Sequence, residues 1–191
     1  MSDGIICPWD IPPFPEHGDT SADLTYAAVG RAMSEWEELE LYLARLYAKF
    51  LKIPPIRAIA VTEYRNATIF RVRANVIEKA ADKYFVSHPN QEREADFQQL
   101  LGDIRQLSNR RNDIAHGVVK LWWNHRETFS EAIDRNEYML TPSTYMDKKF
   151  GDARAPLYLF RSVEINQFAD HFRRYRLEQL EAMIAYFPDD A

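Results

Sequence analysis

The chain has little cysteine, little glycine and no long apolar run, and each shortage excludes a class of protein. One cysteine in 191 residues excludes an intrachain disulfide and a cysteine-rich zinc site. No segment is apolar over the roughly 20 residues that a transmembrane helix needs. The first residues also lack the basic start and apolar core of a signal peptide. We therefore expect a cytoplasmic protein that does not enter a membrane.

An excess of basic charge is also missing. The 24 lysines and arginines are outnumbered by 29 acidic residues, which gives a net charge of −5. This balance argues against a protein that coats nucleic acid through many phosphate contacts, but it allows a small basic cleft. The 46% content of hydrophobic residues and the count of six glycines favour a globular protein of long helices over a turn-rich β protein.

Apolar residues recur at alternating spacings of three and four over four segments, which predicts four long helices. Prolines, or the end of the apolar pattern, mark where these helices stop. The second helix is expected to break near residues 64–67. The predicted helices cover residues 21–51, 56–85, 91–116 and 162–187.

Two segments do not follow the helical pattern. Four prolines in residues 1–18 predict an extended N-terminal arm. Residues 118–161 contain short β-branched and aromatic runs between polar segments, which predict a small β-hairpin or an irregular insertion. The expected fold is all-α: a single domain over residues 19–191, an antiparallel bundle of four to five helices with this insertion between the third and the fourth.

The residues with the clearest chemical potential close the third helix, in the run from Arg110 to Gly117. Arg111, Asn112 and His116 supply a guanidinium, an amide and an imidazole. These are the groups that metal-free cleavage of a phosphodiester would need, because histidine transfers protons near neutral pH and arginine binds phosphate. Gly117 stands where a helix often ends in a left-handed residue.

The motif points in two directions on an ideal helix. Residues four apart share a face, so Asn112 and His116 extend a polar row that begins with Arg105 and Asn109. Arg111 instead continues the apolar row. On the first helix, Glu40 is the corresponding charged residue in an apolar row, so we expect the two charges to meet. Such a pair would fix the helix register or orient Arg111 in a cleft.

The sequence Arg111-Asn112-Asp113-Ile114-Ala115-His116 resembles the Arg-polar-x-x-x-His motif of the HEPN superfamily, the higher eukaryotes and prokaryotes nucleotide-binding domains. This resemblance implies an all-α bundle and, in many members, a metal-independent endoribonuclease whose two subunits form one cleft. By similarity, Arg111 would contact the scissile phosphate, Asn112 would support it and His116 would transfer protons. The supporting residues would be Glu40, Arg105, Asn109 and Arg110. No metal or cofactor is expected.

Several functions stay open at this point. A ribonuclease of this kind would form a homodimer and cleave RNA. It would act as a toxin or a defence effector, and an antitoxin or another protein would be its partner. A catalytically silent HEPN-like module would instead bind RNA, nucleotide or a protein partner. In a third alternative, a helical interaction protein, Arg111 and His116 would contribute to packing alone. The basic clusters at Arg71–Arg73 and 173–176 are expected to be solvated helix faces, with an RNA path as the alternative.

Overall fold

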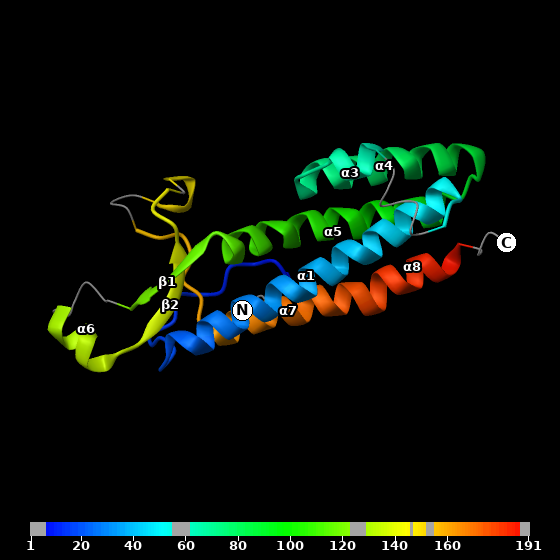
Figure 1. Cartoon of the computed structure of the whole chain (residues 1–191). Coiled ribbons are helices and arrows are strands. Elements are labelled where there is room, and N and C mark those ends of the chain that lie inside the picture. The colour runs from blue at the N-terminus through cyan, green and yellow to red at the C-terminus, as the bar shows by residue number, and fades with distance from the viewer. Residues whose placement is uncertain (1–6, 55–61, 123–128, 146, 152–154, 188–191) are drawn as a thin grey trace, which may run out of the picture. The chain divides into compact units, whose positions relative to one another are not determined.

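The computed structural model describes residues 7–54, 62–122, 129–145, 147–151 and 155–187 (Figure 1). Its contacts divide the chain into two compact units, which are described separately. Unit 1 combines Met1–Glu35 with Asn109–His171, and unit 2 combines Trp36–Ser108 with Phe172–Ala191. The sequence predicted a single domain for residues 19–191.

The first helix, α1, covers Ala22–Leu51 and confirms the predicted segment. The hydroxyl of Ser21 accepts the backbone N–H of Asp23 at 3.1 Å, so it satisfies one of the free donors at the helix start. The helix ends at Leu51, and the next residue, Lys52, adopts a positive φ of 53°, two residues before Pro54.

The second predicted helix is broken, as expected, into α3 (Thr62–Asn66) and α4 (Phe70–Ser87). Its expected start at residue 56 lies outside the described residues. The next helix, α5, covers Gln91–Ala115, and the side chain of Asn90 accepts the backbone N–H of Arg93 at 3.1 Å as its N-cap.

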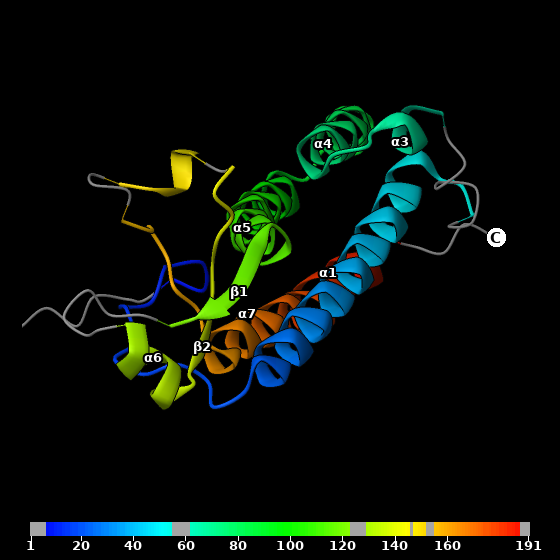
Figure 2. The same ribbon diagram turned by 60° about the vertical axis from the view of Figure 1, so that its left-hand side comes forward.

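The predicted hairpin is confirmed within residues 118–161. Strand β1 (Gly117–Leu121) follows α5 directly and pairs antiparallel with β2 (Tyr138–Pro142), as Figure 2 shows. A short helix that the sequence did not predict, α6 (Phe129–Arg135), lies between the strands, and a 3-10 turn, η1 (Asp147–Lys149), follows them. Phe160 then forms a bridge with Leu140 on β2.

Gly117 does not adopt the left-handed conformation that was predicted for it. The chain passes from α5 straight into β1, so the backbone at this residue is not that of a left-handed helix cap. A Cβ atom at Gly117 would lie 2.6 Å from Cγ of Leu140. Glycine at this position therefore leaves room for the side chain of Leu140 and does not serve backbone freedom.

The last predicted helix is confirmed as a nearly continuous helical run. It consists of α7 (Ser162–Arg174), a π-helical turn η3 (Tyr175–Leu180) and α8 (Glu181–Tyr186). The π turn was not predicted, because residues 162–187 contain no proline or glycine that would mark it.

Each unit has an aromatic core of its own. In unit 2, the ring of Phe50 contacts Phe85, Phe97 and Phe187 at centroid distances of 6.0, 5.0 and 5.1 Å. In unit 1, Tyr158 stacks on Phe160 at 4.7 Å. Edge-to-face and offset arrangements of this kind add to the stabilisation from apolar burial.

Asp19, at the end of the arm, connects several segments of unit 1. Its nearly buried carboxylate accepts the hydroxyl of Thr25 and both the N–H and the hydroxyl of Ser162, each at 2.7 Å. Its backbone N–H donates to the carbonyl of Tyr138 at 2.8 Å. One residue thus connects the starts of α1 and α7 with strand β2. Between Cys7 and Gly18 the arm forms no helix or strand.

The fold class is mostly helical with one small antiparallel hairpin, which agrees with the predicted class. The antiparallel bundle itself stays a prediction. Among the described helices, none combines the length and the hydropathy needed to cross a membrane.

Candidate functional site

The three residues that were predicted to be catalytic lie at the C-terminal end of α5, all in unit 1: Arg111 and Asn112 within the helix and His116 directly after it. Arg111 Nη1 donates to the side-chain oxygen of Asn112 at 3.2 Å, and both side chains are half-buried. The backbone N–H of His116 donates to the carbonyl of Asn112 at 3.1 Å, while the imidazole is exposed. The imidazole of His116 is therefore accessible, and it lies one turn after the guanidinium of Arg111 and the amide of Asn112, which are hydrogen-bonded to each other.

Arg110 belongs to a different environment, although it directly precedes the motif. Its guanidinium is almost buried, and Nη2 lies 3.0 Å from the carboxylate of Asp113. On the other side of that carboxylate lies Lys149 Nζ, at 2.8 Å. The side chain of Asp113 has no exposed surface, so this carboxylate is buried between two cations.

Tyr158 completes this cluster through the backbone. Its hydroxyl donates to the carbonyl oxygen of Asp113 at 2.9 Å. Burial raises the pKa of Tyr158, and the negative charge of Asp113 raises it further. The hydroxyl therefore keeps its proton and remains a donor. We refer to Arg110, Asp113, Lys149 and Tyr158 as the Asp113 cluster.

Asp113 was not predicted as a site residue, although the sequence contains a signal for it. An arginine and an aspartate three residues apart on a helix can form an ion pair, as Arg110 and Asp113 do. The contribution of Lys149 and Tyr158 could not be found in the same way, because both come from the insertion, more than 30 residues later in the chain.

Glu40 has a partner other than the predicted one. Its buried carboxylate accepts the indole N–H of Trp36 at 2.8 Å and pairs with the guanidinium of Arg73, which belongs to α4 in the same unit. The expectation that Glu40 pairs with Arg111 is corrected accordingly. The first turn of α4 brings Arg73 to this position, where it also donates to the carbonyl of Ala67 at 3.0 Å.

Arg105 and Asn109 were predicted to support the site from the same polar row. Asn109 is exposed, in unit 1. Arg105 lies in unit 2, where its guanidinium donates to both carboxylate oxygens of Glu78 at 2.7 and 3.2 Å and to the amide oxygen of Asn75 at 3.1 Å. These contacts join α5 to α4. They explain the position of the Arg105 side chain without a role in the candidate site.

The Arg105–Glu78 pair gives a prediction about pH. Hydrogen bonds from Arg105 hold the pKa of Glu78 below its ordinary value. Because the folded pKa is lowered, the stability from this pair is present above the ordinary glutamate pKa of about 4.3 and is lost as the pH falls through the folded pKa. We expect Glu78→Gln to lower the midpoint of thermal unfolding near pH 7, and to lower it less at a pH below the ordinary glutamate pKa. Asp82→Asn, at an exposed position on the same helix, is the control, and an equal effect of Glu78→Gln at both pH values would contradict the prediction.

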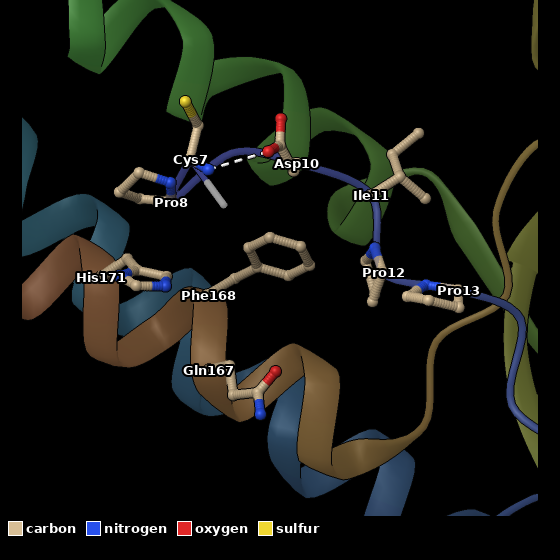
Figure 3. A pocket seen from close by; sticks show the side chains of 9 residues that line it. All are labelled: Cys7, Pro8, Asp10, Ile11, Pro12, Pro13, Gln167, Phe168 and His171. Carbon is tan, nitrogen blue, oxygen red and sulfur yellow. Dashed lines mark hydrogen bonds between the residues drawn. The ribbon is translucent and has the colours of Figure 1, made fainter. Parts of the chain in front are cut away.

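A pocket of about 550 Å³ lies in unit 1 between the N-terminal arm and α7 (Figure 3). Phe168 and the prolines of the arm supply its apolar surface, and Asp10, Gln167 and His171 supply polar groups. Asp10 accepts the backbone N–H of Cys7 at 2.8 Å. None of the predicted site residues lines this pocket, so it is separate from the candidate site.

The chemistry that the candidate site offers is proton transfer and anion binding. His116 has an accessible imidazole for proton transfer, and Arg111 has a guanidinium that can bind an anion. Within the described part of the chain, no three histidine, cysteine or acidic side chains are grouped as metal ligands.

Comparisons with models of protein families, with curated proteins and with solved structures gave no match. The residues of the chain are therefore the sole basis for a function.

Proposed function

We propose that this protein is a HEPN-like endoribonuclease that cleaves RNA without a metal ion, with its active site at the C-terminal end of α5. The observation that carries this proposal is the exposed imidazole of His116, one turn after the hydrogen-bonded pair of Arg111 and Asn112. The resemblance of this sequence to the Arg-polar-x-x-x-His motif supports the same assignment.

The proposed reaction uses the ribose of the RNA as its own nucleophile. The 2′-hydroxyl loses its proton and attacks the adjacent phosphorus, while the 5′-oxygen of the next nucleotide leaves and gains a proton. The products are a 2′,3′-cyclic phosphate and a 5′-hydroxyl. His116 transfers these protons, and Arg111 stabilises the negative charge that develops on the phosphate oxygens. Asn112 orients the guanidinium through its side-chain oxygen.

Two protons are transferred in this reaction, one from the nucleophile and one to the leaving group. A homodimer of helical bundles with two facing motifs would supply a separate histidine for each transfer. The homodimer, the antiparallel bundle, a role as a toxin or defence effector, and an antitoxin partner belong to this proposal.

The proposal is tested by incubating the purified protein with mixed cellular RNA in EDTA and analysing the ends of the products. Cleavage with cyclic-phosphate and 5′-hydroxyl ends is the expected result. RNA binding without cleavage would instead favour a catalytically silent HEPN-like module. Cleavage that stops in EDTA and returns with a divalent cation would contradict the proposed mechanism.

A further inference from the structure

Described residues of the insertion between α5 and α7 contact the candidate site at Asp113. This residue lies within the motif, between Asn112 and His116, and its side chain points into the interior of unit 1, with no exposed surface. Lys149, on η1, lies 2.8 Å from the carboxylate, and Tyr158, which follows η1 in the chain, donates to the backbone carbonyl at 2.9 Å. The side chain and the backbone of Asp113 are thus both held by residues that follow β2.

The backbone contact is significant because of where α5 ends. The last four carbonyls of a helix lack partners within it, and the carbonyl of Asp113 is one of these. A further helical turn would supply the N–H of Gly117, but Gly117 already begins β1. The hydroxyl of Tyr158 takes the place of that N–H. It satisfies the carbonyl at the point where the chain changes from helix to strand.

The side-chain contact has a different consequence. A buried carboxylate is stable only when its charge is compensated by cations. Arg110, on α5, and Lys149, on η1 of the insertion, provide these cations for Asp113. Arg110 belongs to the helix itself, so it cannot fix the helix end relative to the rest of unit 1. Lys149 comes from the insertion and therefore can.

We propose that Asp113 is a positioning residue, through which Lys149 and Tyr158 of the insertion hold the last turn of α5 so that Arg111, Asn112 and His116 keep the geometry needed for RNA cleavage. This inference rests on the proposed function. It gives the insertion a role as a support of the active site. Asp113 and Lys149 act through the turn that they hold and do not contact the RNA.

Lys149 is the residue to vary, because Asp113→Ala would leave Arg110 buried without a counter-charge and would unfold the protein. Lys149→Met keeps the length of the side chain and removes its charge, and Lys149→Arg restores the charge. Lys148→Met is the matched control, since Lys148 is an exposed neighbour on the same 3-10 turn.

We expect Lys149→Met to lower kcat for RNA cleavage about tenfold or more with KM changed less than about twofold, because a misplaced catalytic group slows the chemical step. Lys149→Arg should recover most of this loss, and Lys148→Met should have wild-type kcat and KM. If Lys149 bound RNA directly, the loss would appear in KM, with a weaker dependence on salt. That result would overturn the proposal.

Amide hydrogen exchange tests the same contact without RNA cleavage. In Lys149→Met, the amides of residues 114–117 should exchange about tenfold faster, while those of α4 keep their wild-type protection. Unchanged protection at 114–117 would overturn the positioning role, even if no RNA substrate is cut by the wild type. Faster exchange with unchanged kcat would overturn it as well. A wild-type protein without ribonuclease activity whose exchange behaves as expected would contradict the proposed function alone.

Discussion

Replacing His116 with alanine is expected to abolish ribonuclease activity while leaving the fold intact. General acid–base catalysis by a placed side chain contributes roughly 10²- to 10⁴-fold to a rate, so we expect a fall in kcat/KM of at least about 100-fold. The imidazole is exposed, and the hydrogen bond to Asn112 comes from the backbone N–H, which alanine retains. The midpoint of thermal unfolding should therefore stay within about 1 °C of the wild type, as for other exposed substitutions.

The measurement compares initial rates of RNA cleavage in EDTA for the wild type and His116→Ala. His17→Ala is the matched control, because the side chain of His17 is also exposed and pairs with Glu137, apart from the motif. The control should cleave RNA at the wild-type rate. Full activity in His116→Ala would disprove the catalytic assignment, and equal losses in the two variants would point to a general effect of histidine removal.

The long helices could be predicted from the sequence because their evidence is local. Spacing, capping residues and prolines located α1 and α5 to within one residue at each end. The break between α3 and α4 was also predicted from local residues. The π turn at Tyr175–Leu180 has no proline or glycine to mark it, and its buried residues, Tyr175 and Leu180, are five apart, a spacing that the expected pattern of three and four did not include.

Features that depend on contacts between distant segments were predicted poorly. Gly117 was interpreted from its place after a helix, whereas its cause is the side chain of Leu140 on the other strand. Asp113 was passed over because its second cation and its tyrosine belong to the insertion. The motif itself was found from local sequence, and the structure adds which of its side chains are exposed and which are held.

The two charges in apolar rows show the same limit. Glu40 was correctly expected to need a cation, because a buried carboxylate must be paired. The choice of Arg111 assumed that the charge misplaced on another helix would be the partner. Arg73 had been assigned to a solvated face, yet it is the residue that the start of α4 places against Glu40. The need for a partner was predictable, but its identity depends on which helices are neighbours.

Replacing Arg73 with alanine is therefore expected to destabilise unit 2 strongly. The change leaves the carboxylate of Glu40 buried without its cation, although the indole N–H of Trp36 still donates to it at 2.8 Å, and it also removes the hydrogen bond to the carbonyl of Ala67. Breaking a buried ion pair typically costs 3–5 kcal/mol. Because Arg73 is partly exposed, we expect a loss of about 3 kcal/mol in the free energy of unfolding.

Urea denaturation of Arg73→Ala measures this loss, with Arg71→Ala as the control from an exposed position in the same turn. The control should differ from the wild type by less than about 0.5 kcal/mol. Adding Glu40→Gln to Arg73→Ala should recover part of the lost stability, because it removes the buried charge that Arg73 had compensated. If Arg111 were the true partner of Glu40, Arg111→Ala would be the strongly destabilising change and Arg73→Ala would resemble its control. The ranking of these two arginine variants thus decides which helix neutralises Glu40, independently of any ribonuclease activity.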